Sequence, residues 1–320
     1  MDARTLFVIP DECERGRADK VLATMPQISR TRSSIAHLIK AGYIKANGLT
    51  LRPSTLLGPG DEIELLELAS ITIPLALMAS PSVPIIYEDE NLLVVDKPAG
   101  LVTHPGAGAR QPTLMDIVIN IRPQIIGVGE EGRWGIVHRL DKDTSGVMAI
   151  AKNQTAYSEL SRQFKQHSIH RVYKAIVKGN PKNDSGSVDS QIGRDSKDRK
   201  KMTTKPVRGR SAHSDWRVLE RFSGFTLLEI RPKTGRTHQI RAHLASVNMP
   251  VLGDKVYGAA TTKQIRQDRM LAKLLNIMER QALHAAELGI SMVGNDHTMF
   301  FMAELPDDMQ NAVSVLRSQT

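Results

Sequence analysis

Short apolar segments of β-strand length recur through the last three quarters of the chain, and they constrain the fold more than any other feature. They lie at residues 92–96, 146–151, 172–177, 188–192, 216–220 and 225–230. Runs of this length that end at turn residues are typical of strands. Segments with helical periodicity are fewer, at 153–166 and 239–246. The sequence therefore predicts an α+β fold with a strand-rich mixed sheet.

A smaller domain is expected in front of this one. Residues 69–84 carry three prolines among small residues, as linkers do. Before them, residues 29–42 open with capping residues, place apolar side chains at helical spacing and stop at a glycine. An Asn47-Gly48 turn between strand-like segments follows. We expect a small α+β domain at 1–68, a linker at 69–84 and the larger domain at 85–320.

Charge and cysteine content narrow the class of protein. The net charge of +9 favours a polyanionic partner. A single cysteine, Cys13, excludes an intramolecular disulfide framework and a zinc site built from several cysteines. The N-terminus has no apolar core of signal-peptide length, and acidic residues and a proline interrupt the apolar stretch 63–78. We expect a soluble cytoplasmic protein that does not act on membranes.

The excess positive charge is concentrated in one segment. Up to Glu67 the chain has nine basic and nine acidic residues, whereas residues 193–210 have eight basic and two acidic ones. One interpretation is a mobile, solvated loop. The other is a clamp on nucleic-acid phosphates, which gives affinity without sequence choice. A membrane-binding segment would need apolar anchors, which this segment lacks.

The densest polar cluster is HRLDKDTSG at 138–146, which lies between two apolar segments. Functional loops are commonly positioned by buried strands in this way. A polar turn bonded to its own backbone is an equal alternative. A calcium loop would use Asp141, Asp143 and Ser145, but Lys152 stands where the bidentate glutamate is required.

Motifs for cofactors and metals are weak or absent. The GxGxxG match at 127–132 leads into a strand-like segment and carries two glutamates, which would repel phosphate. The chain has no HExxH and no GxSxG. We therefore predict no cofactor and no metal. A second polar cluster, 231–244, is either an anion-friendly surface or a partly buried helix start, with Gln239 and His243 on one face and Arg241 elsewhere.

Three motifs carry a family resemblance. HRLDKDTSG at 138–146, IHRVYKAIVKG at 169–179 and GRTHQIRAHL at 235–244, followed by GDKVYG at 253–258, resemble the ribosomal large-subunit type of RNA pseudouridine synthase. The resemblance covers about residues 85–310. Residues 17–61 separately resemble the small RNA-binding domain called the alpha-L or S-four type, with Ala46 replacing the usual apolar residue of its turn.

The resemblance implies isomerisation of uridine in RNA to pseudouridine without metal, redox or nucleotide cofactor. It assigns catalysis to Asp141, which would attack the sugar, attack the base or act as a general base. Arg241 would hold the carboxylate ionised and oriented, and Tyr173 would stack on the uracil. Arg139 would fill the space left by the flipped base, with His138 in a supporting role.

The resemblance also implies that the partner is RNA, either ribosomal RNA or pre-ribosomal particles. We expect the protein to act as a monomer. Transfer RNA and a non-catalytic role in RNA binding or ribosome assembly remain as alternatives. The residues expected to contact RNA are Arg17, Arg30, Arg32, Lys40, Lys197, Arg199, Lys200 and Lys201.

Overall fold

The computed structural model describes residues 4–28, 32–40, 42–66, 82–104, 112–130, 132–198, 201–291 and 297–318. The chain divides into two compact units. One comprises Met1–Val94, Val102–Arg139 and Ala149–Arg162, and the other Val95–Leu101, Leu140–Met148 and Gln163–Thr320. Residues 69–81 of the expected linker at 69–84 lie outside the described residues.

The N-terminal elements form a small α+β arrangement. They are β1 (Arg4–Val8), β2 (Gly16–Arg17), α1 (Ala18–Val21), η1 (Leu22–Thr24), α2 (Arg32–Lys40), β3 (Ile44–Ala46), β4 (Leu49–Thr50), β5 (Leu56–Leu57) and β6 (Glu62–Leu66). The antiparallel order is β1-β6-β3-β4, and β2 pairs with β5. Helix α2 buries Ile35, Leu38 and Ile39, the side chains whose spacing predicted it. Asn47 and Gly48 have φ of 51° and 75°, as a tight turn between β3 and β4 requires.

The remaining elements contain the strands and helices that the sequence predicted. They are β7 (Ile85–Glu88), β8 (Leu92–Lys97), α4 (Leu114–Ile121), η3 (Pro123–Ile125), β9 (Ser145–Ala151), α5 (Gln154–Gln166), β10 (His170–Lys178), β11 (Ser185–Arg194), β12 (Met202–Thr203), β13 (Arg210–Phe222), β14 (Phe225–Pro232), α6 (Gln239–Ser246), α7 (Thr262–Gln267), α8 (Arg269–Ile277), β15 (Leu283–Ser291), β16 (Thr298–Met302) and α9 (Asp307–Arg317). The predicted strand-rich α+β class is confirmed.

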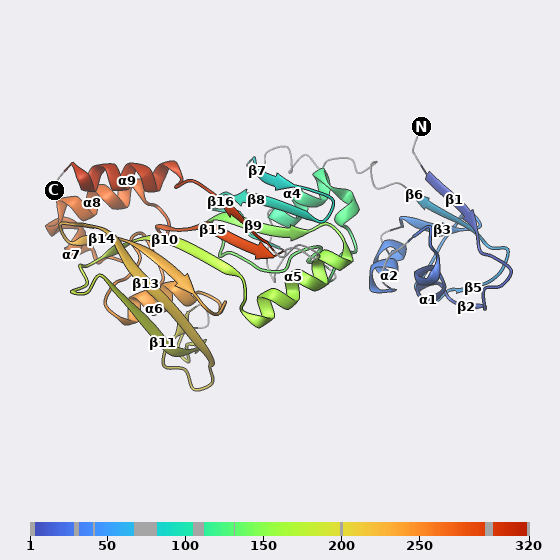
Figure 1. The fold of residues 1–320 in the computed structure, drawn as a ribbon, viewed down its shortest axis with the longest axis horizontal. Coiled ribbons are helices and arrows are strands. Elements are labelled where there is room, and N and C mark those ends of the chain that lie inside the picture. Colours follow the sequence, from blue (N-terminus) through green and yellow to red (C-terminus); the bar gives the residue numbers. More distant parts are fainter. Residues whose placement is uncertain are drawn as a thin grey trace. The chain divides into compact units, whose positions relative to one another are not determined.

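Most of these strands belong to one mixed sheet. Among the described residues its order is β12-β11-β13-β14-β10-β15-β9-β8-β7, with β16 paired to β15 (Figure 1). The pairs from β11 to β15 are antiparallel, whereas β9 runs parallel to β15 through Ser145 and Gly146. A Cβ on Gly146 would lie 2.2 Å from the Ala285 carbonyl oxygen. The glycine therefore lets β9 approach β15 closely, directly after the polar segment 138–146.

A hydrophobic core lies where helices pack on the C-terminal part of this sheet. It joins Ile176 of β10 and Leu228 of β14 to Leu244 of α6, Leu274 of α8 and Val313 of α9, all buried. Helices α8 and α9 pack on each other beside this sheet (Figure 1). Burial of this apolar surface fixes α6 against the strands, which in turn determines where its polar side chains point.

Candidate active site

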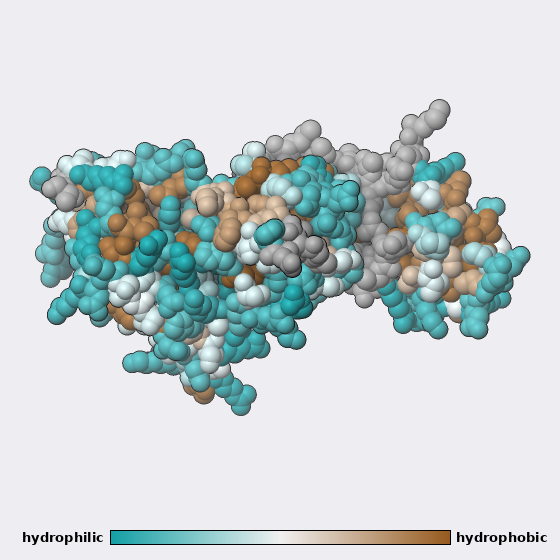
Figure 2. Space-filling model, in the orientation of Figure 1, coloured by the Kyte–Doolittle hydropathy of each residue, from teal (hydrophilic) through white to brown (hydrophobic). Residues whose placement is uncertain are grey.

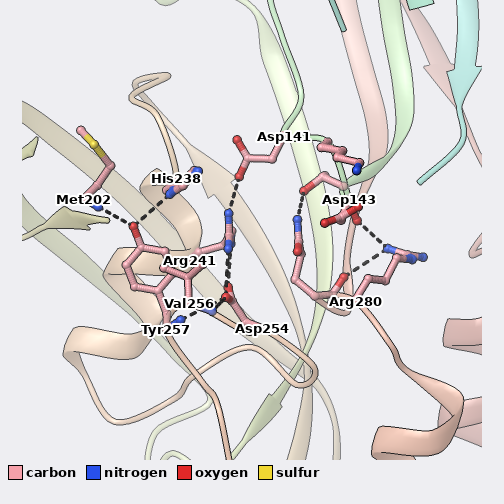
Figure 3. Close-up of polar contacts among 12 residues, drawn as sticks. Asp141, Asp143, Met202, His238, Arg241, Asp254, Val256, Tyr257 and Arg280 are labelled. Atoms are coloured by element: carbon pink, nitrogen blue, oxygen red, sulfur yellow. Dashed lines mark hydrogen bonds and ion pairs between the residues drawn. The ribbon is translucent and has the colours of Figure 1, made fainter. Parts of the chain in front are cut away.

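The centre of the candidate site is a row of three charged side chains (Figure 3). Arg241 of α6 lies between Asp141 and Asp254. Its Nη1 donates to Asp141 Oδ2 at 3.0 Å, while its Nε and Nη2 donate to the two oxygens of Asp254 at 2.6 and 2.9 Å. Asp254 therefore fixes the guanidinium bidentately, and Arg241 Nη1 is left to orient Asp141.

Burial makes this row electrostatically strong. The Asp254 side chain is fully buried and Arg241 nearly so, whereas Asp141 keeps 19% of its side chain exposed. Burial alone would raise the pKa of Asp254, but Arg241 and the backbone N–H groups of Val256 and Tyr257 lower it overall. Burial likewise disfavours charged Arg241, and the two carboxylates raise its pKa above the usual value. Arg241 is thus a fixed cation, and Asp141 is the exposed end of the row.

The backbone of the Asp141 loop is held from several directions. The Thr144 N–H donates to the Asp141 carbonyl at 3.0 Å, which closes a turn. Arg280 Nη1 donates to the Asp143 carbonyl at 3.1 Å, and Gln281 Nε2 to Thr144 Oγ1 at 3.2 Å. The segment is therefore a turn held by backbone and neighbouring side chains, but the carboxylate of Asp141 bonds Arg241 rather than its own backbone, unlike the polar turn considered from the sequence.

A buried lysine at the end of β8 supports the same loop. Lys97 has no exposed surface, and its Nζ donates to the carbonyls of Pro98, Leu101 and Lys142 at 2.8, 2.8 and 3.0 Å. Burial lowers its pKa to about 7, while the three carbonyl acceptors match the three N–H groups of the ammonium form. Lys142 directly follows Asp141, so Lys97 anchors the loop next to Asp141.

Replacing Lys97 with methionine is expected to lower both stability and activity. Three carbonyls would lose a charged donor in a buried place, which costs about 3 kcal/mol of unfolding free energy. Loss of the Lys142 anchor is expected to lower, about tenfold in a single-turnover assay, the activity that the resemblance implies. Urea denaturation measures the first effect. Lys182→Met, which removes an exposed lysine, is the control; equal stability of the two variants would contradict the anchoring role.

Tyr257 connects the charged row to the basic segment 193–210. Arg241 Cζ lies 5.1 Å from the centre of its ring, and the Met202 N–H donates to its hydroxyl at 2.8 Å. The hydroxyl also lies 3.0 Å from His238 Nδ1, and burial raises its pKa to about 12. Lys201 Nζ lies over the same ring, 5.6 Å from its centre.

The basic segment is partly ordered as a hairpin. Gly193 and Arg194 of β11 pair with Thr203 and Met202 of β12. The side chain of Asp195 accepts from the backbone N–H of Lys197 at 2.8 Å, which caps the turn. Figure 2 shows mainly hydrophilic side chains over the projecting end of β11 and β13. The described part of the segment therefore forms a short hairpin, and Arg199 and Lys200 lie outside the described residues.

The start of α6 is buried rather than solvated. Gln239 Nε2 donates to the His213 carbonyl and to Ser214 Oγ, both at 3.0 Å. His243 Nδ1 lies 3.1 Å from the same hydroxyl, and burial lowers its pKa to about 4. The predicted division of faces is confirmed, because Gln239 and His243 contact β13 while Arg241 faces Asp141.

The other predicted catalytic residues lie as follows. Tyr173 of β10 is partly buried against the core, beside a bulge in the pairing with β15, and burial raises its pKa. Arg139 is exposed, two residues before Asp141. His138 Nε2 accepts from the Ala149 N–H at 3.0 Å, so this ring nitrogen bonds the backbone.

The predicted RNA contacts of the N-terminal part are partly described. Arg17 and Arg32 are about half exposed, and each donates through Nε to the buried Asp19 at 3.1 Å. Their charges are thus partly compensated. Arg30 and the side chain of Lys40 lie outside the described residues. Lys197 is exposed in the basic hairpin.

Residue-by-residue reasoning assigned no role to Asp254, Tyr257 or Lys97. The first two lie in the GDKVYG string, which was noted only as part of the resemblance. The signal for Lys97 was a charge at the end of an apolar strand and just before a proline. Within the described residues, no three histidine, cysteine, aspartate or glutamate side chains form a metal-binding group. No described helix is long and apolar enough to cross a membrane.

Comparisons of the sequence with known proteins find a family model and curated relatives that share one activity in their names. Residues 91–246 match the family model described as RNA pseudouridylate synthase. A Xanthomonas campestris protein named ribosomal large subunit pseudouridine synthase D is 38% identical over 98% of this chain and 92% of its own. The protein of the same name from Pseudomonas aeruginosa is 38% identical over 97% and 94%.

Solved structures share the fold. Human RNA Pseudouridylate Synthase Domain Containing 4 matches with a TM-score of 0.58 and 24% identity, over 73% of this chain and 93% of that one. Human RNA Pseudouridylate Synthase Domain Containing 1 matches with a TM-score of 0.53 and 24% identity, over 74% and 95%.

Proposed function

Because this chain belongs to the RNA pseudouridine synthase family, we propose that it converts uridines of large-subunit ribosomal RNA into pseudouridine. The names of its relatives from Xanthomonas and Pseudomonas support this choice of RNA. Transfer RNA is the second candidate. The proposed setting is the cytoplasm, with the enzyme acting as a monomer on free ribosomal RNA or pre-ribosomal particles.

The observation that carries the proposal is the arrangement around Asp141. Its carboxylate is the one exposed end of a buried charged row, and Arg241 is held in place by Asp254. A carboxylate presented in this way is oriented by a fixed guanidinium without a metal. It can attack the sugar, attack the base or take a proton from the sugar, and all three remain open.

The reaction balances within the substrate. The bond between C1′ of the ribose and N1 of uracil breaks, the base turns while bound, and C1′ joins C5. The hydrogen on C5 leaves as a proton and N1 gains one, so no oxidant or reductant is consumed. Tyr173 is proposed to stack on the uracil during this rotation. Arg139, exposed beside the loop, is proposed to enter the RNA stack when the base leaves it, with His138 fixing the start of the loop.

Two parts of the chain are proposed to grip RNA. The small N-terminal domain, proposed as residues 1–68 and of the S-four type, would contact RNA through Arg17, Arg30, Arg32 and Lys40. The basic hairpin would clamp phosphates beside the active site, because Lys201 and Met202 both contact Tyr257.

Neutralising Lys197, Arg199, Lys200 and Lys201 together is expected to weaken RNA binding and flatten its salt dependence. Each lost contact to a single-stranded phosphate lowers the slope of log K against log salt by about 0.7. The isomerisation step at saturating RNA should persist. Filter binding across salt concentrations measures the slope. A control variant removes the same charge from helices α7 and α8, at Lys263, Arg266, Arg269 and Lys273. Equal salt slopes for the two variants would show that the hairpin is an ordinary solvated surface and not a phosphate-binding site.

The proposed activity is tested by tritium release from ribosomal RNA transcribed with 5-tritiated uridine. The purified protein should release tritium, and the same positions should lack pseudouridine in a deletion strain. RNA binding without tritium release would favour the alternative, a non-catalytic assembly factor. If tritium is released from transfer RNA and not from ribosomal RNA, transfer RNA is the substrate.

A further inference from the structure

Arg171 is a partly buried cation that the protein leaves incompletely bonded. It lies on β10, two residues before Tyr173, so both side chains occupy the same face of the strand. Its Nη2 donates to the Pro232 carbonyl at 3.1 Å, but its buried Nε has no hydrogen-bond partner. Among the described residues, no carboxylate forms an ion pair with it. Burial lowers its pKa.

A second arginine lies close to the first. Arg236 is partly buried, its Nε donates to the Ser211 carbonyl at 3.2 Å, and within the described part of the chain it has no carboxylate partner either. Burial lowers the pKa of His167, and the charges of Arg171 and Arg236 lower it further. The positive charges of both guanidinium groups therefore act on His167, and neither group has a carboxylate partner among the described residues.

The local backbone leaves room for the guanidinium. Gly235 directly precedes Arg236 in the chain, and a Cβ at this position would stand 3.1 Å from Arg171 Nη1. The Phe164 ring lies 6.0 Å from Arg171 Cζ and supports it from another side. A partly buried guanidinium that is held in place without a carboxylate partner lowers the stability of the free protein. Such cost is typical of a residue whose partner arrives with the substrate.

We propose that Arg171, assisted by Arg236, binds a backbone phosphate of the RNA next to the reacting uridine. This rests on the proposed function, in which Tyr173 contacts the uracil. A guanidinium matches the oxygens of a phosphate in geometry and charge. RNA is the anion that the activity brings to this face of β10. The contact would place the flipped nucleotide against Tyr173 and Asp141, so Arg171 acts as a substrate-positioning residue.

The test uses Arg171→Met and Arg171→Lys in the full chain. We expect Arg171→Met to raise the melting temperature of the free protein, because an uncompensated buried charge is removed. The same variant should bind RNA about tenfold more weakly at 0.1 M salt and lose about 0.7 from the salt slope, whereas Arg171→Lys should keep the slope. Arg317→Met, which removes an exposed arginine paired with Glu220, should leave the slope unchanged.

Replacing a single phosphate of the RNA with an uncharged methylphosphonate tests which phosphate Arg171 contacts. In a short RNA carrying a mapped target uridine, a methylphosphonate beside that uridine should weaken binding by the wild type about as much as Arg171→Met does, and it should not weaken the variant further. An unchanged salt slope in Arg171→Met would overturn the proposal, and with a lowered melting temperature it would assign Arg171 to the fold alone. RNA binding is measured independently of tritium release, so a wild type that binds without isomerising would defeat the proposed function and leave this test intact.

Discussion

Asp141→Asn is expected to lower tritium release from 5-tritiated RNA by at least about 10⁴-fold while leaving the fold and RNA affinity nearly unchanged. Asparagine keeps an oxygen that can accept from Arg241 Nη1, so the geometry of the row should survive. What disappears is the negative charge, and with it the nucleophile or base on which every proposed route depends. Single-turnover release and filter binding measure the two properties separately.

The control for this variant is Asp184→Asn. Asp184 is largely exposed and pairs with Arg221, so its neutralisation changes net charge equally without touching the site. Residual activity of Asp141→Asn within tenfold of this control would remove Asp141 from catalysis. Loss of RNA binding in Asp141→Asn would instead mean that the carboxylate supports the loop rather than the reaction.

The sequence predicted the strands well because each is a short apolar run that ends in turn residues. β10, β13 and β14 all extend beyond their apolar centres. In β13 and β14, for example, Ser214 and Asp215 pair with Pro232 and Arg231 and continue the ladder. Their polar ends carry no periodic signal. The helix α6 was predicted at its observed bounds, because residues 239–246 have helical periodicity.

The site was only partly accessible from the sequence. The DKDTSG loop and the arginine of α6 are separated by 100 residues, and nothing in local spacing brings them together. Their pairing came from the family resemblance. The role of Asp254 depends on where the turn after α6 returns the chain, which is a tertiary property. Arg171 was equally hidden, because an uncompensated charge is visible only when every neighbour is known.

The same dependence on tertiary context explains the charge distribution. The sequence places positive charge in the hairpin and at Arg17 and Arg32, but the structure gives the latter two a shared buried acid in Asp19. Arg171 shows the opposite case, a cation within an ordinary strand that lacks such an acid. The net charge of a segment therefore does not show which of its cations already have a carboxylate partner in the fold.

Asp254→Asn is expected to give the largest loss of stability of any single change in the site. Removing one charge from a buried ion pair leaves Arg241 with Asp141 as its only carboxylate partner among the described residues, which costs about 3–5 kcal/mol. Arg241 would then shift toward the exposed Asp141, and activity should fall about 10²-fold. Urea denaturation and single-turnover tritium release measure these effects.

The pH dependence separates this pair from other sources of stability. The pKa of Asp254 is lowered in the folded state, so its contribution is present above the pKa of an unfolded aspartate and is lost as pH falls through the folded value. Wild-type stability should therefore decline in acid more steeply than that of Asp254→Asn.

A double variant, Arg241→Met with Asp254→Leu, removes both charges and should recover much of the lost stability, because no buried charge is left unpaired. It should remain as inactive as Arg241→Met alone, since nothing orients Asp141. If the double variant regained activity with its stability, Asp254 would serve the fold and Arg241 would have no part in positioning the carboxylate.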